Sequence, residues 1–301
     1  MQIDSKILVF IFSKDRACQL EQLLRSLEKN AAPIERFNIA VLFDSSSSSF
    51  NEGYQIIAKQ YPSVRLIRQN TNTSISLQVK QIVQAAKETF ICFMVDDNIL
   101  IRTFSLNDPQ FLLFEADKTI SYLGLRFSPE ICYSQTFRTV VPPPAIDCSG
   151  RFQWRYPLNR FQKALAKRGF YREKYFRHWS FPLALDGNIT RREHLAKVFD
   201  KIKELKTVGE IEREFWKHPP SGDFGICYPK ARLINTPLNR VDTDVADWPH
   251  ANISPEMLNT QFIQGKRLDF SWLENLLINS SHIEVPVFWQ DETREDKRRC
   301  G

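Results

Sequence analysis

The first hundred residues alternate short apolar runs with amphipathic stretches, and this alternation constrains the fold more than any other feature of the sequence. Four of the apolar runs have the length of β-strands: 6–12, 38–43, 64–67 and 90–95. Three stretches between them carry apolar residues at helical spacing: 16–29, 51–60 and 74–88. Strand and helix units in this order form a parallel sheet with right-handed crossovers. The sequence therefore predicts an α/β fold with a mostly parallel sheet flanked by helices.

The fourth apolar run ends at a pair of carboxylates. Residues 90–95 carry no charge and are rich in aromatic and branched side chains, which is typical of a strand buried on both faces. Asp96 and Asp97 follow directly, and Asn98 comes next. Ligand sites of open α/β sheets lie at the carboxyl ends of strands, so we expect a cation or hydroxyl donors to relieve the repulsion between these charges. The alternative is a solvated Asp-Asn turn.

Polar residues follow the other strands at the same expected edge of the sheet. Residues 13–16 come after the first strand, and Asp44 comes after the second. With Asp96 and Asp97 they form an edge that suits a nucleotide. Neither a Gly-x-Gly-x-x-Gly fingerprint nor a P-loop is present, so those two modes of phosphate binding are not expected. The serine run at 45–49 is interpreted as a flexible, solvated loop rather than as a phosphate site.

Composition places the chain among ordinary globular proteins. It has 301 residues, of which 43% are hydrophobic and 25% charged. No run approaches the roughly 18 apolar residues that span a bilayer, and the N-terminus lacks the profile of a signal peptide, so we expect a cytoplasmic protein. The six cysteines include no Cys-x-x-Cys pair, which predicts free thiols rather than disulfides or a zinc site.

The second half of the chain carries weaker structural signals. The three prolines at 142–144 are its clearest linker. Apolar runs and a Ser-Pro-Glu start predict three strands and one helix: 119–127, 231–236, 285–289 and 254–262. Thr190 with Glu193, and Thr207 with Glu210, match the capping box. The first box predicts a helix that extends to residue 205, and the second predicts one over 211–216.

Residues 151–177 form a basic and aromatic segment. It contains nine Lys or Arg residues and one acid, a local charge of +8 in a chain whose net charge is +6, so the remainder sums to −2. Such a segment can bind nucleic acid, lie on anionic lipid, or form a solvated face over a sugar-stacking platform. We favour the platform with a surface near the membrane. Nucleic acid ranks last because no RNA- or DNA-binding motif accompanies the charge.

The order of these motifs resembles a known family. A strand followed by Phe12, Ser13, Lys14, Asp15 and Arg16, a second strand ending at Asp44, and then Val95 with Asp96, Asp97 and Asn98 make up the matching pattern. This pattern resembles the nucleotide-sugar-binding half of GT-A (Rossmann-like) glycosyltransferases, most of all glycosyltransferase family 2. Asn98 stands where the family's acidic motif has its last acid, and serines replace the acidic-glycine loop after Asp44.

The resemblance implies roles for the donor-side residues. Asp44 would hold the nucleotide base, Asp96 the ribose and Asp97 the metal. Ser13 and Arg16 belong to the same donor edge. The resemblance further implies a nucleotide-diphosphate sugar as donor and Mn²⁺ or Mg²⁺ as cofactor, since a divalent cation stabilises the departing diphosphate.

Three further side chains complete the expected site. Lys80 could add positive charge near the donor, although a solvated helix lysine is the alternative. Asp186, in the loop 185–188, resembles the general base in the acceptor loop of inverting members, and a simple Asp-Gly turn is the alternative. His282 resembles the late histidine that closes the metal site in many GT-A enzymes, and a surface histidine is the alternative.

The sequence thus leads to one hypothesis with two rivals. It predicts a metal-dependent, inverting glycosyltransferase of polysaccharide or glycolipid biosynthesis, acting on a glycan or glycolipid acceptor. The rivals are a non-catalytic nucleotide-sugar-binding module and a nucleotidyltransferase. We expect a donor-binding portion over 1–141, an acceptor-binding portion of the same GT-A domain over 142–291, and a charged tail over 292–301. Peripheral contact with the inner face of an anionic membrane is expected through 151–177.

Overall fold

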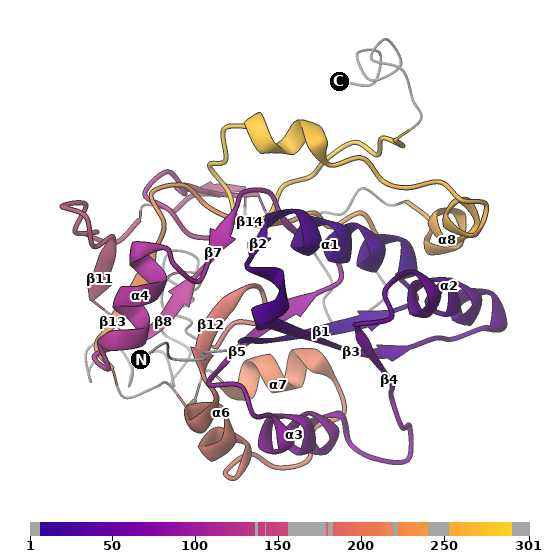
Figure 1. The fold of residues 1–301 in the computed structure, drawn as a ribbon, viewed down its shortest axis with the longest axis horizontal. Helices are drawn as coiled ribbons and strands as arrows, with labels where there is room; N and C mark the ends of the chain where they lie inside the picture. The colour runs from indigo at the N-terminus through magenta and orange to yellow at the C-terminus, as the bar shows by residue number, and fades with distance from the viewer. Residues whose placement is uncertain are drawn as a thin grey trace.

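Within the residues that the structure describes, eight strands form one central sheet that organises the fold (Figure 1). The computed structural model describes residues 7–135, 138–141, 143–155, 179, 183–215, 217–218, 222–239 and 253–290. Across the sheet the strands follow the order β11 (Gln153–Arg155), β13 (Phe224–Cys227), β8 (Ile120–Gly124), β12 (Asn188–Arg191), β5 (Phe90–Val95), β1 (Ile7–Lys14), β3 (Phe37–Asp44) and β4 (Arg65–Arg68).

Most strands of this sheet run parallel to their neighbours. β1 is parallel to β3 on one side and to β5 on the other, and β3 is parallel to β4. β12 lies antiparallel between β5 and β8, β13 is parallel to β8, and β11 closes the row in the antiparallel direction. The α/β fold with a mostly parallel sheet is therefore confirmed. The antiparallel insertion of β12 brings the second half of the chain beside the acidic strand.

Helices cover both faces of the sheet (Figure 1). One face packs against α1 (Ala17–Asn30), α2 (Ser48–Gln60) and α8 (Pro255–Ile263), and the other against α3 (Ile75–Ala85), α6 (Arg192–Phe199) and α7 (Val208–Phe215). α4 (Pro109–Ala116) packs beside β8. This arrangement leaves the carboxyl ends of the parallel strands as a rigid edge on which side chains can be placed.

The period-two pattern of β1 explains the two apolar layers. Ile7, Val9 and Ile11 belong to the core under α1 and α2. The residues between them point the other way, into the core under α3, α6 and α7. Because both faces of the strand are covered, its sequence is an almost unbroken apolar run, as expected for a central parallel strand.

Several short elements frame the site. They pair as β6 (Asn98–Leu100) with β14 (Leu233–Asn235), β2 (Ala31–Ala32) with β7 (Phe104–Ser105), and β9 (Tyr133–Ser134) with β10 (Thr139–Val140). Two single-turn helices lie at Ile34–Arg36 and Ser271–Asn275. β6 begins directly after the acidic pair. Its pairing with β14 therefore places residues from more than a hundred positions later in the chain beside that pair.

The two capping boxes have different outcomes. Thr207 and Glu210 form the reciprocal pair, because Glu210 N donates to Thr207 Oγ1 at 3.1 Å and Thr207 N donates to Glu210 Oε2 at 3.1 Å. Thr190, in contrast, lies buried in β12, and α6 starts two residues later with no side-chain cap. The prediction from Thr190 was wrong because strand pairing with β5 supersedes a local helix signal. The helix also ends at Phe199, short of the predicted residue 205.

Two other local predictions need correction. The serine run is not a flexible loop, because α2 starts at Ser48 and the Ser47 hydroxyl accepts a hydrogen bond from Phe50 N at 3.3 Å. No strand forms over 285–289 within the described residues, where the pairing is limited to a bridge between Leu268 and Trp289. Pro286 lacks the N–H that a ladder needs, which explains the interruption.

The predicted boundary at 142–144 does not divide the sheet, since strands from both sides of it share one sheet. The basic segment falls outside the described residues from 156 to 177, and so does the tail at 292–301. Among the helices that the structure describes, none has the length and apolarity to cross a bilayer. The described cysteines are all unpaired, as predicted for them.

Candidate functional site

The acidic pair is buried at the end of β5. Asp96 is 3% exposed and Asp97 is 7% exposed, so the alternative of a solvated turn is wrong. Arg16 Nη1 donates to both carboxylates, at 3.1 Å to Asp96 Oδ1 and 3.3 Å to Asp97 Oδ2. Asn235 Nδ2 donates to Asp97 Oδ1 at 2.8 Å. The pair is therefore the centre of a connected polar group drawn from β5, the start of α1 and β14.

Arg16 is held in place along its whole length. Its Nε donates to Asn239 Oδ1 at 2.7 Å, and its Nη2 donates to the Asn239 carbonyl. Its backbone N–H donates to the Tyr54 hydroxyl at 3.2 Å, and that hydroxyl also lies 2.7 Å from Ser13 Oγ. The Arg16 guanidinium consequently has one fixed position, at the carboxyl ends of β1 and β5.

The loops after β1 and β3 are joined, as the parallel topology predicts. Asp15 has a left-handed backbone with φ +54° and donates its N–H to the Asp44 carbonyl at 3.2 Å. Ser46 N donates to Asp15 Oδ1 at 2.7 Å, and Lys14 Nζ lies 3.6 Å from Asp44 Oδ2. The structure thus places Ser13, Arg16, Asp44 and the acidic pair at one edge of the sheet.

Asp186 reaches the same edge through the turn before β12. Gly187 N donates to the Phe93 carbonyl at 2.8 Å, which fixes this turn against β5. Asp186 Oδ2 accepts from Arg126 Nη1 at 2.6 Å, and His282 Nε2 lies 3.9 Å from the same oxygen. The negative charge of Asp186 also raises the pKa of Asp97. Residues separated by about ninety positions in the sequence are therefore brought together.

His282 is tied to the acidic pair by backbone contacts. Asn235 N donates to the Ser281 carbonyl and Ile283 N donates to the Asn235 carbonyl, each at 2.9 Å. Asn235 then reaches Asp97 with its side chain. His282 is 6% exposed and is not the surface histidine that the sequence left open.

Burial dominates the electrostatics of the site. It raises the pKa of Asp97 to about 7, aided by the like charges of Asp96 and Asp186 and opposed by Arg16. Burial also raises the pKa of Asp96, against the nearby Arg16 charge. The pKa of His282 is lowered to about 4 by burial, so its imidazole is neutral at pH 7. The site thus has excess negative charge that is costly to keep ionised.

Lys80 is not brought to this edge. Its ammonium lies 2.9 Å from Asp200 Oδ1, at the end of α6. The pair belongs to the helical layer of α3, α6 and α7 (Figure 1). A lysine on α3 therefore supports that layer rather than the acidic pair.

Sequence reasoning missed Arg126, Asn235, Asn239 and Tyr54. Arg126 had a detectable signal, because it is a single charge between apolar residues in the run 119–127, and a buried charge requires a partner. The others had none, since a lone Asn or Tyr in a strand, loop or helix has no pattern that marks it as part of a site.

As arranged, the described residues do not form a cage for a divalent cation. Such an ion needs several donors converging at about 2.0–2.6 Å. Asp97 uses Oδ1 for Asn235 and Oδ2 for Arg16, and Asp186 uses Oδ2 for a guanidinium. No three His, Cys, Asp or Glu side chains within the described ranges converge to hold a metal. The expected metal role of Asp97 with His282 thus lacks an arranged donor set.

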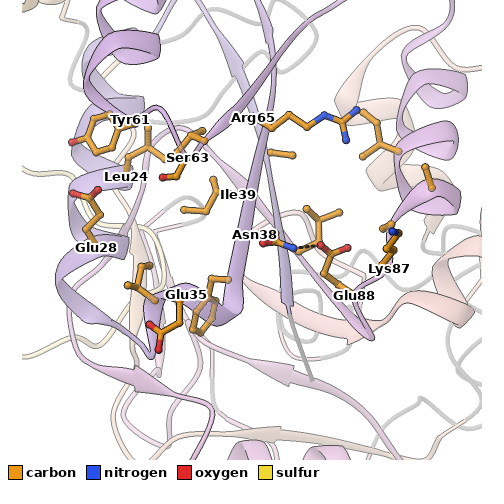
Figure 2. Close-up of a pocket in the computed structure, with 18 residues that line it drawn as sticks. Leu24, Glu28, Glu35, Asn38, Ile39, Tyr61, Ser63, Arg65, Lys87 and Glu88 are labelled. Carbon is orange, nitrogen blue, oxygen red and sulfur yellow. Dashed lines mark hydrogen bonds between the residues drawn. The ribbon is translucent and has the colours of Figure 1, made fainter. Parts of the chain in front are cut away.

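A cavity of about 920 Å³ lies at the opposite edge of the sheet (Figure 2). It is lined by residues at the amino ends of β1 and β3, among them Leu8 and Asn38. Figure 2 shows the hydrogen bond there from Asn38 Nδ2 to Glu88 Oε1. None of the site residues expected from the sequence lines this cavity, so it is separate from the acidic site.

Comparison with known proteins gives two sequence matches. Residues 8–105 match the family model described as glycosyl transferase family 2. The chain is also 31% identical over 112 residues to the bifunctional glycosyltransferase pgtA of Dictyostelium discoideum. That match covers 35% of this chain and only 14% of the relative's length.

Solved structures show more distant likenesses. A mannosyltransferase from Pyrobaculum calidifontis, PcManGT, solved in complex with GDP-Man and Mn²⁺, aligns with a TM-score of 0.42 at 10% identity, over 75% of this chain and 55% of that one. S. aureus TarS 1–349 aligns with a TM-score of 0.43 at 14% identity, over 74% and 60%.

The sequence match and the geometry fall on the same part of the molecule. The matched residues include β1, α1, β3, α2, β4, α3 and β5, with the acidic pair at the end of the last strand. The resemblance to glycosyltransferase family 2 is therefore confirmed for residues 8–105, the part of the chain that supplies Ser13, Arg16, Asp44, Asp96 and Asp97.

Proposed function

We propose that this chain is an inverting glycosyltransferase, which moves a sugar from a nucleotide-diphosphate sugar to an acceptor hydroxyl. The observation that carries the proposal is the position of Asp186, whose carboxylate lies at the same sheet edge as Asp96 and Asp97. It is close enough for its charge to raise the pKa of Asp97. The family match of residues 8–105 supports the reaction class. A donor-binding edge and a candidate base thus belong to one site.

The donor occupies the edge formed by β1, β3 and β5. Asp44 is assigned to the nucleotide base and Asp96 to the ribose, in keeping with their positions after β3 and β5. Ser13 and Arg16 lie between them, and the Arg16 guanidinium is the positive charge nearest the acidic pair among the contacts of the described residues. Lys80 is left out, since its partner lies in the helical layer.

Asp186 acts as the general base. Within the described part of the chain its polar contacts are on Oδ2, held by Arg126, which leaves Oδ1 for the acceptor hydroxyl. As the hydroxyl oxygen attacks the anomeric carbon, Asp186 takes its proton and the bond from that carbon to the diphosphate oxygen breaks. The nucleoside diphosphate leaves with the electron pair of that bond. Arg126 fixes the direction of the carboxylate, and the neutral His282 packs beside it without adding charge.

The resemblance also implies Mn²⁺ or Mg²⁺, which would supply positive charge to the departing diphosphate. Because the described residues do not offer an arranged donor set, the steps above use only side chains of the chain itself. A glycan or glycolipid acceptor, and contact of residues 151–177 with the inner face of an anionic membrane, stay predictions. Only 151–155 of that segment are described.

Nucleotide titration followed by turnover tests the proposal. We expect calorimetry to show binding of one nucleoside diphosphate in preference to others, and the matching nucleotide sugar to be hydrolysed slowly without acceptor and faster with one. Binding without turnover against a panel of glycan acceptors would instead favour the non-catalytic module. Release of pyrophosphate from a nucleoside triphosphate and a sugar phosphate would favour the nucleotidyltransferase.

A further inference from the structure

We propose that the Arg16 guanidinium is the resident cation of the acidic pair, so that this chain binds its nucleoside diphosphate without a divalent metal. The inference rests on the proposed function for the identity of the ligand. It departs from what the resemblance to glycosyltransferase family 2 implies, and it is carried by the contacts of Arg16. The guanidinium bridges the two carboxylates with one nitrogen, at 3.1 and 3.3 Å.

Each of the four oxygens of the acidic pair already accepts a hydrogen bond. Asp96 Oδ1 and Asp97 Oδ2 accept from Arg16, Asp96 Oδ2 accepts from Lys14 N at 3.3 Å, and Asp97 Oδ1 accepts from Asn235. A cation that bound both carboxylates would have to share these oxygens with donors from three separate parts of the chain, and it would lie beside the positive charge of Arg16. Each carboxylate therefore has hydrogen-bond donors and a counter-charge from the chain itself, supplied by β1, the start of α1 and β14 together.

Arg16 is also not free to leave. Its side chain is 12% exposed, and the nitrogens other than Nη1 both donate to Asn239, which fixes the plane of the guanidinium. Tyr54 holds the backbone of the same residue. A flexible surface arginine could move aside when a cation arrived. One that is anchored at each nitrogen and at its backbone is a permanent part of the site.

The guanidinium can serve a diphosphate as well as the carboxylates. It carries five N–H groups. With the residues that the structure describes, the guanidinium makes four hydrogen bonds, two to the acidic pair and two to Asn239, so within that part of the chain one N–H of Nη2 is left for a phosphate oxygen. Guanidinium groups form strong, directed hydrogen bonds with phosphate and stay protonated in proteins. Arg16 would thus keep the acidic pair from repelling the diphosphate and would stabilise the leaving group.

A Mn²⁺ titration without nucleotide tests the inference directly. The electron paramagnetic resonance signal of aqueous Mn²⁺ is followed as the wild type, Arg16→Gln and Arg25→Gln are added. Arg25 is the matched control, because it pairs with the buried carboxylate of Glu21 on the same helix but lies away from the acidic pair. We expect Arg16→Gln alone to take up one equivalent of Mn²⁺ and to gain melting temperature from it. Tight stoichiometric uptake by the wild type would overturn the inference.

Nucleotide binding supplies the second arm. We expect the affinity of the wild type for UDP or GDP to be the same in EDTA and in Mn²⁺. The affinity of Arg16→Gln should fall by about tenfold or more in EDTA, because a charge-assisted contact is lost, and should recover with Mn²⁺. Loss of wild-type binding in EDTA with recovery in Mn²⁺ would contradict the inference. Should Arg16→Gln unfold in EDTA, Arg16→Lys keeps the charge without the fork and is expected to bind in EDTA more weakly than wild type.

The two arms separate the failure of this inference from that of the proposed function. If no nucleoside diphosphate binds to any of the proteins in either condition, the glycosyltransferase proposal fails. The Mn²⁺ titration still decides whether Arg16 occupies the cation position, because it requires no nucleotide.

Discussion

The carboxylates of the site are paired with two guanidinium groups. Arg16 serves Asp96 and Asp97, and Arg126 serves Asp186, with Arg126 only 2% exposed at its side chain. Removing one partner of a buried ion pair leaves an uncompensated charge and costs about 3–5 kcal/mol. Each carboxylate is consequently held in one orientation, which is what a binding site or a general base requires.

Asp186→Asn keeps the size of the side chain and removes its basicity. If Asp186 takes the acceptor proton, transfer should fall by roughly 10² to 10⁴ while nucleotide affinity persists, since that is the usual contribution of a general base. The measurement pairs nucleotide titration with acceptor turnover. Asp200→Asn, which changes a carboxylate in the helical layer, is the control. Transfer by Asp186→Asn within a few-fold of wild type would place the base elsewhere.

His282 should make folding stability depend on acid pH. Its folded pKa of about 4 lies below the unfolded value because of burial, so the stabilisation is fully present above about pH 6.5 and is lost as pH falls towards 4. The groups facing it are Asp186 and Arg126. Wild type should lose up to about 3 kcal/mol more than His282→Gln over this range in urea unfolding. Parallel stability profiles of the two proteins would refute a neutral buried histidine.

At the scale of elements, the turn between Leu185 and β12 decides where Asp186 points. Gly187 has φ +75°, and a Cβ added there would lie 2.9 Å from Leu233 Cδ2. The turn is also fixed from both sides, since Gly187 donates to the Phe93 carbonyl and accepts from Leu125 N. The candidate base is therefore positioned by three features together: strand β12, its pairing with β5, and this one glycine.

Gly187→Ala should therefore affect both stability and transfer. The left-handed backbone alone costs a residue with a Cβ about 1–2 kcal/mol, and the contact with Leu233 adds to this. We expect a lower free energy of unfolding and a loss of transfer larger than any loss of nucleotide affinity. Gly209→Ala is the matched control, because it lies in α7 with an open side-chain position and should stabilise the helix by about 0.5–1 kcal/mol. Full transfer activity in Gly187→Ala would mean that the turn does not position the base.

At the scale of the whole molecule, the two portions of the chain are interleaved. β12 lies between β5 and β8, so a strand from the second portion fills a gap in the sheet of the first (Figure 1). β13 then extends the sheet beyond β8. The linker prolines at 142–144 separate the portions in sequence but not in the fold.

A fragment of residues 1–141 should not fold by itself. It lacks β12, so the facing edges of β5 and β8 would be unpaired, and open strand edges promote aggregation. We expect this fragment to be insoluble or to elute as aggregates in size-exclusion chromatography, whereas the full chain should unfold in one cooperative transition. A soluble, monomeric fragment with its own cooperative unfolding would show instead that the portions are independent domains.

The sequence by itself determined the layers of the fold and half of the site. The alternation in β1 and the leucine stripe of α1 are local patterns, and each specifies which face of its element is buried. Because parallel strands end at a common edge, the positions of Asp44, Asp96 and Asp97 after apolar runs were enough to bring them together. Capping at Thr207 was equally predictable, since its partner Glu210 is three residues away.

Only the tertiary structure decided the rest, because the decisive contacts join residues far apart in the chain. Thr190 has a helix-start sequence, yet pairing with β5 makes it a strand residue. Lys80 lies on α3, and the direction of its side chain depends on the packing of α6 beside that helix, which no local pattern in the sequence indicates. Arg126 and Asn235 reach the carboxylates, and Asn239 reaches the Arg16 guanidinium, from distant parts of the chain. There the free energy of satisfying buried charges, rather than any local propensity, selects the residue.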